Sequence, residues 1–499
     1  MLKSNSNVNI EPTVLDINRT NNSNEKHQQE QNFIGWSLAN FLESTSRGGV
    51  DLFMPIFAQN LGANSTQIGL MSGLFSLVSI FQLLWANISM KIQKPKILVT
   101  LGWFISFCLF IPLALIKKGQ LMILLIIRTI QGFFYSASGP TQATLIAEHI
   151  TQNERAKKVG TLTWLGLGGA FTGTLIGGFI VSVLSEALMF DLRTSFLVLF
   201  LWTCLLGILA SLIFYLSVPE LKPSIGVDPI RVIEQGIIYP VSSSKLSIHD
   251  KVIRYLKKFR NFWCFTFFMS IFYFGVNLAA PFFIILKIEV YNINLFMASV
   301  LTSISTILQV ILGIIIVHTN FLDKIGRKRP LIIGGILVSL GTIGVTFPYY
   351  FGFSFYAWGI ITWSLMGIGW GFFNASLTVF LLDIVHPQYR MILIASYNTI
   401  NGCAMFFGPI FGGIIIQMTD DILIVFLLRG TIILFSICLL FTIKEPEIPG
   451  VMIHPLKYFF MKYFRFGTDR GSEITFPPIR VRKIHLKNWL PHWRPKQAK

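Results

Sequence analysis

Long apolar segments dominate this sequence and leave few folds open to it. From about residue 32 onward, twelve segments of roughly 20 to 30 residues are almost entirely apolar. Each is long enough for a helix to cross a hydrocarbon core of about 30 Å. The predicted spans are 33–58, 66–88, 97–116, 120–146, 159–184, 195–217, 261–286, 294–317, 330–349, 354–384, 391–417 and 422–443. The expected fold class is an all-α membrane protein with twelve transmembrane helices.

The composition agrees with a membrane protein. Hydrophobic residues make up 53% of the 499 residues and charged residues only 13%, so a water-soluble fold would expose too much apolar surface. The five cysteines fall in apolar segments without a C-x-x-C pair, and no histidine cluster, phosphate loop or nucleophile motif stands out. We therefore expect neither an enzyme nor a bound metal or cofactor.

The spans divide into two sextets around a polar, proline-containing stretch. The expected parts are a disordered cytoplasmic arm at 1–31, a six-helix bundle at 32–217, a cytoplasmic linker at 218–260, a second six-helix bundle at 261–443 and a tail at 444–499. From Val451 onward the tail carries eleven Lys and Arg residues against Asp469 and Glu473, interleaved with aromatic residues. This mixture favours contact with anionic lipid headgroups over nucleic-acid binding.

Lysine and arginine in the connections predict the orientation. If the first helix runs outward, most basic residues fall on the inner side, and the outer connections hold only Lys117, Lys118, Arg193 and Lys287. We therefore expect a multi-pass protein of the cell membrane with both termini cytoplasmic, acting as a monomer. The side that this rule predicts to be extracellular is called the outer end below, and the opposite side the inner end.

The two halves share a glycine pattern that indicates duplication. Gly173 to Gly178 and Gly408 to Gly413 both lie inside apolar segments, and each residue of the second stretch follows its counterpart by 235 positions. Repeats of this kind build many transporters, in which the substrate site lies between the halves.

Three motifs resemble those of the major facilitator superfamily, in particular its drug-proton antiporter group. They are Asp323-Lys-Ile-Gly-Arg-Lys-Arg-Pro330 between helices 8 and 9, Arg128-Thr-Ile-Gln-Gly132 in helix 4, and the helix-5 glycines. The resemblance implies two six-helix domains that rock about a central site. The residues to which it and the repeat assign gating are Asp323, Gly326, Arg327, Glu148, Arg155, Asp383, Arg390, Gly173, Gly177, Gly178, Gly408, Pro409, Gly412 and Gly413.

Two of these gating assignments have open alternatives. Glycines spaced by four let a second helix backbone approach closely, either across the two domains or within one of them. Glu148 precedes Arg155 by seven residues, and Asp383 precedes Arg390 by the same number. These pairs are either latches that close the inner end or solvated loop charges worth little.

Charges inside the predicted membrane segments are the strongest functional pointers, because each is costly there unless it is paired or hydrated. Glu43, Arg47 and Asp51 are spaced by four and share one face of helix 1. Asp51 and Arg128 lie at similar depths, about 12 to 15 Å from the outer end at about 1.5 Å per residue, so we expect them to meet. Glu43 or Asp51 is the predicted protonation site, with Arg47 and Arg128 as partners; alternatively, the stripe only fixes helix 1.

The resemblance also implies which helices line the central cavity, and polar and aromatic residues on these helices are the predicted substrate contacts. They are Tyr135, Ser138, Gln142, Tyr273, Asn277, Trp370 and Asn374. A break of helix 4 at Gly139–Pro140 is expected nearby. Arg429 in helix 12 is expected to snorkel or to contact lipid.

Together these features predict a secondary active transporter that moves a small organic solute by alternating access, with proton-coupled efflux as the leading interpretation. Two alternatives stay open at this point. One is an uncoupled uniporter of sugars or other metabolites, and the other is a non-transporting membrane receptor on the same fold.

Overall fold

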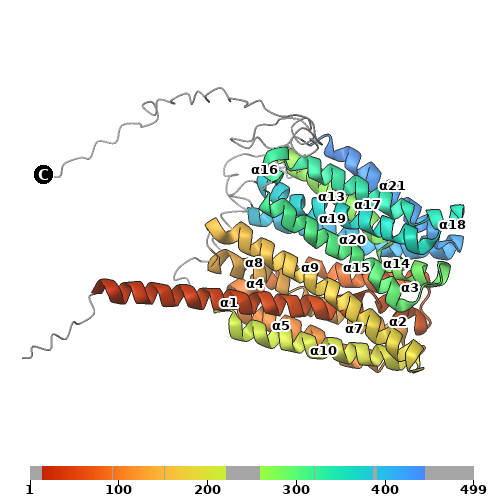
Figure 1. Cartoon of the computed structure of the whole chain (residues 1–499), viewed down its shortest axis with the longest axis horizontal. Coiled ribbons are helices and arrows are strands. Elements are labelled where there is room, and N and C mark those ends of the chain that lie inside the picture. Colours follow the sequence, from red (N-terminus) through yellow and green to blue (C-terminus); the bar gives the residue numbers. More distant parts are fainter. Residues whose placement is uncertain are drawn as a thin grey trace, which may run out of the picture. The chain divides into compact units, whose positions relative to one another are not determined.

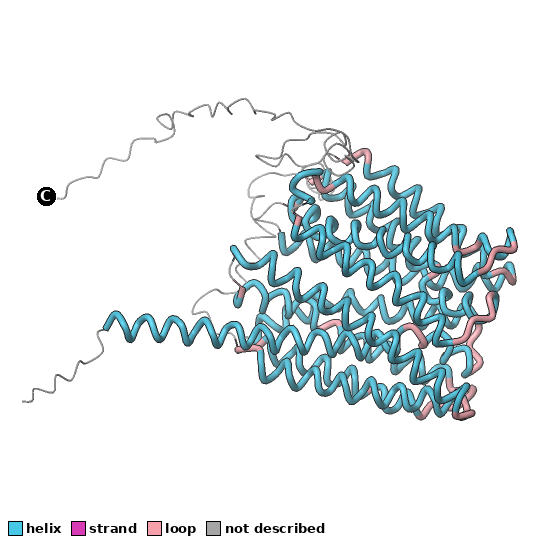
Figure 2. The backbone as a smooth tube through the Cα atoms, in the orientation of Figure 1, coloured by secondary structure: helices cyan, strands magenta, loops and turns pink. Residues whose placement is uncertain are grey.

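The computed structural model describes residues 14–92, 94–150, 152–220, 259–319, 321–385 and 390–443, which belong to one compact unit. The described part consists of helices and connections and contains no strand (Figure 2). The predicted tail lies outside these residues, and so does most of the predicted linker.

In the first half, helices follow the predicted apolar segments closely. They are α1 (Val14–Asp51), α2 (Met54–Asn60), α3 (Ser65–Leu77), η1 (Val78–Phe81), α4 (Gln82–Ile92), α5 (Pro95–Cys108), α6 (Phe110–Ala114), α7 (Leu121–Tyr135), α8 (Ser138–His149), α9 (Gln152–Ser182), η2 (Val183–Ala187) and α10 (Leu192–Ser217). The break between α7 and α8 falls at residues 136–137, just before the predicted position, because Pro140 is tolerated in the first turn of the new helix α8.

The second half repeats this succession. Its elements are α13 (Arg260–Leu278), η3 (Ala280–Phe282), α14 (Phe283–Ile285), η4 (Leu286–Val290), α15 (Leu295–His318), α16 (Phe321–Ile325), α17 (Lys328–Gly344), α18 (Phe347–Phe351), α19 (Phe355–Ile384), α20 (Arg390–Thr419) and α21 (Ile422–Leu440).

Eight helical stretches of the described residues are long and apolar enough to cross a membrane. They are 95–114, 158–187, 192–217, 260–290, 295–316, 355–384, 396–419 and 422–440. The other four predicted segments are helical too. Three of them divide into shorter helices, for example α17 and α18 near Pro348, whereas α1 is 38 residues long but carries Glu43, Arg47 and Asp51 in its last turns. The full count of twelve crossings stays a prediction.

Helix α1 corrects one expectation about the N-terminus. Residues 14–31 were expected to be disordered, yet α1 begins at Val14 and runs without interruption into the bundle. In Figure 1 this helix extends well past its neighbours. Once the buried part of a helix has formed, each further residue adds a hydrogen bond without a new nucleation cost, so a polar extension can remain helical.

Helix packing follows the same plan in both halves. Helix α1 packs against α9 and α10, as α13 packs against α20 and α21. Helices α3 and α7 form a pair in the first half, as α15 and α19 do in the second. The halves meet mainly through two pairs, α3 with α20 and α9 with α15. The predicted pseudo-symmetric arrangement is thus present in the contacts themselves.

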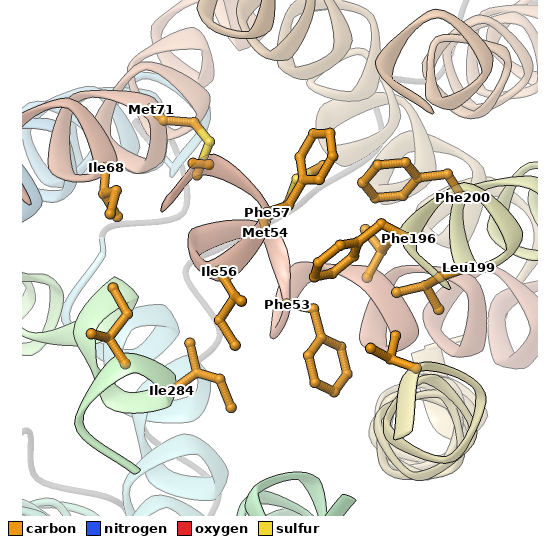
Figure 3. Packing of buried hydrophobic residues seen from close by; sticks show 14 of the residues in the cluster. Phe53, Met54, Ile56, Phe57, Ile68, Met71, Phe196, Leu199, Phe200 and Ile284 are labelled. Carbon is orange, nitrogen blue, oxygen red and sulfur yellow. The ribbon is translucent and has the colours of Figure 1, made fainter. Parts of the chain in front are cut away.

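A buried aromatic core joins the broken first helix to α10. Phe57 lies edge-on to Phe200, with 4.9 Å between ring centroids, and Phe196 packs beside them (Figure 3). Ile284 of α14 belongs to the same cluster, so apolar packing near the outer end continues from the first half into the second. This core holds α2 at a fixed position beyond the charged end of α1.

Candidate transport site

The three charges of α1 form a continuous ionic stripe. Arg47 lies between the two carboxylates: its Nη1 is 3.7 Å from Glu43 Oε1, and its Nη2 is 3.3 Å from Asp51 Oδ2. Glu43 is only 4% exposed, whereas the Asp51 side chain is 36% exposed. The helical spacing of four residues places all three on one face, as the sequence predicted.

Helix α7 completes this network from the side. Arg128 Nη2 lies 3.4 Å from Asp51 Oδ1, so the predicted meeting of these two residues is confirmed. The Tyr135 hydroxyl donates a 2.9 Å hydrogen bond to Glu43 Oε1 and accepts one from Arg47. The four charges sum to zero, which lowers the cost of holding them in the membrane.

Further neighbours fix the orientation of Arg128, which is 6% exposed. Its Nη1 donates a 2.6 Å hydrogen bond to Gln131, and Gln131 in turn donates to the Ser106 carbonyl of α5. The guanidinium lies 4.6 Å from the ring centroid of Phe75. Since its position is set from α3, α5 and α7, Arg128 is a fixed cation toward which Asp51 can turn.

A cavity of about 360 Å³ opens beside the stripe, between α1 and α9. Its polar lining includes Asn40, Ser44, Arg47 and Asp51, and Leu162 to Ala170 of α9 supply much of the opposite wall. Ser44 also donates a 3.1 Å hydrogen bond to Glu43. Asn40 and Ser44 were not among the predicted contacts, although each shares the helical face that the charges identified.

The predicted substrate contacts have mixed positions. Tyr135 belongs to the ionic network, and the Ser138 hydroxyl donates to the Tyr135 carbonyl of its own chain segment. Asn277 donates to the Tyr273 carbonyl, and Trp370 packs edge-on against Phe272 and Phe373. None of the seven predicted residues lines the cavity between α1 and α9. Gln142 and Asn374 are half-buried, and their role stays a prediction.

Lys287 corrects a prediction about the second half. It was expected in an outer connection, but it is fully buried at the π-helical end η4. Its Nζ donates to the Ala298 carbonyl and to the Thr302 hydroxyl, and it lies 4.2 Å from the centroid of the Trp363 ring. Backbone and hydroxyl acceptors thus replace the water that a loop lysine would have.

Arg429 corrects a second prediction. It was expected to snorkel or to contact lipid, yet it is only 4% exposed and its guanidinium packs 4.6 Å from the centroid of Phe283. Helix α21 packs against both α13 and α17, so this face points into the half rather than toward lipid. Neither Lys287 nor Arg429 forms an ion pair with a carboxylate in the described residues.

The positions of the second half that correspond to Arg128 and Tyr135 carry tryptophans. The position 235 residues after Arg128 is Trp363, and the position 235 residues after Tyr135 is Trp370. Trp370 belongs to an aromatic cluster in which Phe272 and Phe373 stack at 4.2 Å with an interplanar angle of 7°. One half therefore presents a network of paired charges, and the corresponding region of the other presents aromatic rings with Lys287 beside Trp363.

At the inner end, the loop between helices 8 and 9 pairs with helix 10. Gly326 adopts a left-handed backbone (φ 86°), as the predicted glycine turn requires, and the next residue, Arg327, forms an ion pair with Asp383 of α19. The predicted pairs Glu148–Arg155 and Asp383–Arg390 stay predictions, because the side chains of Glu148, Arg155 and Arg390 lie outside the described set. The side chain of Asp323 lies outside it as well.

The glycine segments pack mainly within their own halves. A Cβ on Gly173 or Gly177 would meet backbone atoms of Thr45 or Gly49 in α1, and one on Gly408 or Gly412 would meet the Phe274 or Leu278 carbonyl in α13. Close backbone contact therefore joins α1 to α9 and α13 to α20.

Only the last glycine of each segment faces the other half. A Cβ on Gly178 would meet Ser299 of α15, and one on Gly413 would meet the backbone of Ser65 and Thr66 in α3. The two positions are related by the same 235-residue offset. Pro409 also belongs to this contact, because its carbonyl faces Gly69 of α3.

Polar bonds between the halves accompany these glycines at the outer end. Thr66 donates a 2.6 Å hydrogen bond to Gln417, and Gln59 donates one to Glu289. Aromatic contact between Phe179 and Phe296 adds to the α9–α15 side. The halves are thus in close contact near the outer end on both sides of the bundle.

Alanine at Gly173 should separate α1 from α9. The new Cβ would lie 2.7 Å from the Thr45 carbonyl carbon and 2.9 Å from the Gly49 nitrogen, so the helices must shift, at a cost of about 1 to 3 kcal/mol. Gly168→Ala is the matched control on the same helix, because its Cβ would lie 4.0 Å from the nearest neighbouring atom. Chemical unfolding in detergent should show destabilisation for the first variant only; equal stabilities would contradict this packing.

The described helices, their repeated packing and an ionic network beside a cavity define a multi-pass membrane transporter. The chain belongs to the Major Facilitator Superfamily, whose family model matches residues 36–320 and 271–452. The resemblance inferred from the sequence motifs is therefore confirmed.

Individual relatives either match only part of this chain or have low sequence identity to it. The multi-drug resistance efflux pump PmrA of Streptococcus pneumoniae is 30% identical over 175 residues, which cover 33% of this chain and 42% of the pump. The uncharacterized MFS-type transporter MJ1317 of Methanocaldococcus jannaschii is 24% identical over 433 residues, or 85% of this chain and 99% of the relative. The match to the pump spans less than half of that protein.

Two solved structures share the fold. The nucleoside transporter NupG has a TM-score of 0.59 and 16% identity, covering 83% of this chain and 98% of its own. A bacterial homolog to the human lysosomal transporter Spinster, inward-facing and unoccupied, has a TM-score of 0.58 and 14% identity, covering 83% and 95%. At these identities the likeness extends to the fold alone.

Proposed function

We propose that this protein is a proton-coupled secondary transporter that exports a small organic solute by alternating access. The observation that carries the proposal is the network of Glu43, Arg47, Asp51 and Arg128, which joins two helices beside a cavity. Buried charges of a membrane protein are costly, and a proton relay is a frequent reason for them.

In the proposed cycle, Asp51 or Glu43 carries the coupling proton. Ionised Asp51 holds Arg47 of its own helix and Arg128 of α7 together. Protonation removes that charge and weakens both ion pairs while the two arginines repel each other, so α1 is loosened from α7 near Asp51, although Tyr135 still bonds Glu43 and Arg47. Return of the ionised carboxylate restores the contact, which makes the distance between α1 and α7 depend on the proton.

Efflux as the direction rests on two supports. The partial match to a protein named as a multidrug efflux pump is one, and the helix-5 glycine segment is the other. We further propose that the protein resides in the cell membrane with both termini cytoplasmic and acts as a monomer. The two-domain division at residues 218–260 and contact of the tail with anionic headgroups belong to the same proposal.

Counterflow in proteoliposomes tests the function. Purified protein is first screened by thermal shift against sugars, amino acids, nucleosides and lipophilic cations, because a bound ligand raises stability. The hits are then followed as radiolabelled solutes with and without a pH gradient. Accumulation only with the gradient supports proton coupling. Exchange that ignores the gradient favours the uniporter, and binding without exchange favours the receptor.

A further inference from the structure

Asn401 of α20 is a buried amide without a hydrogen-bond partner. It is 4% exposed, and both its Oδ1 and its Nδ2 lack a partner among the described residues. A carboxamide carries two donors and an acceptor, and in a membrane-embedded helix water is not available to satisfy them. The group therefore fits a partner that this state of the protein does not supply.

Tyr397 lies one turn before Asn401 on the same face of α20. It is 6% exposed, and its hydroxyl is also buried without a partner. The Tyr273 hydroxyl of α13 lies near it but does not meet hydrogen-bond geometry. Two consecutive turns of one helix thus carry three unsatisfied polar atoms.

Aromatic rings pack around Tyr397. Tyr397 stacks on Phe265 of α13 with an interplanar angle of 7° and 6.1 Å between centroids, and Phe380 of α19 lies 5.2 Å from the same Phe265. Two further orphan hydroxyls, Thr266 on α13 and Ser376 on α19, belong to the facing helices.

We propose that Tyr397 and Asn401 form the hydrogen-bonding part of the substrate site in the second half, and that it takes the uncharged planar ring of a heteroaromatic solute. The flat aromatic side chains offer stacking surfaces, and a carboxamide pairs through two bonds with a ring edge that carries a donor beside an acceptor. This inference rests on the proposed transport function. It assigns binding of the planar ring to the second half of the chain and proton coupling to the first half.

The rival explanation is a buried water that satisfies Asn401 permanently. The two explanations predict opposite effects of Asn401→Leu on the ligand-free protein. If the amide has no partner, an apolar side chain of similar volume should raise the melting temperature by a few degrees. If a water satisfies it, losing that bond should lower the melting temperature.

Thermal shift and equilibrium binding on the full chain in detergent test the proposal, with adenine as the planar probe and glucose as a hydrogen-bonding probe without a flat ring. We expect adenine, but not glucose, to stabilise the wild type. Asn401→Leu should weaken adenine binding at least tenfold while raising the ligand-free melting temperature, and Tyr397→Phe should weaken it about threefold. Asn398→Leu, which changes an exposed asparagine of the same helix, should alter neither quantity.

Three results would overturn the proposal: no adenine binding to the wild type, unchanged affinity in Asn401→Leu, or a lower ligand-free melting temperature in that variant. Because the assay needs no proton gradient, its outcome is independent of the coupling proposal. If the wild type binds adenine but shows no proton-driven accumulation, only the coupling proposal is contradicted. If the wild type accumulates a solute with the gradient but does not bind adenine, only the proposed ring site is contradicted.

Discussion

Asp51→Asn should abolish proton-driven accumulation while leaving exchange within about threefold of the wild type. Asparagine keeps the size of the side chain but cannot ionise, so the pairs with Arg47 and Arg128 become ordinary hydrogen bonds at every pH. The variant resembles a permanently protonated carrier. It should still exchange solute across the membrane, but a pH gradient should no longer drive accumulation of the solute.

The measurement is uptake of a radiolabelled solute into proteoliposomes with an imposed pH gradient, beside counterflow without one. Asp191→Asn is the control, since Asp191 is exposed in the connection between η2 and α10 and its side chain caps no helix. Undiminished gradient-driven accumulation in Asp51→Asn would refute the role of Asp51. A loss of both accumulation and exchange would instead indicate that Asp51 is needed for the structure of the site.

Arg128→Met should destabilise the protein by about 3 kcal/mol, near the lower end of the range for removing one member of a buried pair. The lower end applies because the Asp51 side chain remains 36% exposed and keeps its contact with Arg47. The substitution also leaves Gln131 without its 2.6 Å donor. Chemical unfolding in mixed micelles gives the change in free energy.

A double-mutant cycle separates the ion pair from the rest of this loss. Combining Arg128→Met with Asp51→Asn removes both charges, so the double variant should be more stable than the sum of the two single effects predicts, by about 0.5 to 3 kcal/mol. Additive effects would mean that Arg128 stabilises the fold through Phe75 and Gln131 rather than through Asp51.

Local spacing made the ionic network predictable from the sequence. Glu43, Arg47 and Asp51 are four residues apart, which fixes their common face on a helix, and counting from the segment ends placed Asp51 and Arg128 at one depth. Tyr135 was predicted as a substrate contact, whereas its bond to Glu43 was not predicted, because it depends on how α7 rotates against α1. The rotation of α7 about its own axis depends on its packing against neighbouring helices, which cannot be inferred from the sequence of one segment.

Other residues were misjudged because the same side chain suits two environments. Lys287 ends an apolar segment, where the orientation rule assigns it to a connection, but Ala298 and Thr302 of α15 supply acceptors inside the bundle. Arg429 was expected at the lipid side because helix 12 is peripheral in the superfamily that the sequence resembles, but Phe283 and the packing of α21 bury it. The orphan groups of Tyr397 and Asn401 are likewise invisible in the sequence, since the lack of a partner is a property of three dimensions.

The backbone contacts of Gly173 and Gly177 with α1 have a mechanical consequence. With no side chain between them, the backbones of α1 and α9 are in direct contact, so we expect the two helices to move together. Further along α9, Gly178 faces Ser299 of α15 across the boundary between the halves. Under the proposed cycle, a displacement of α1 on protonation of Asp51 would therefore also shift the end of α9 that contacts α15 of the other half.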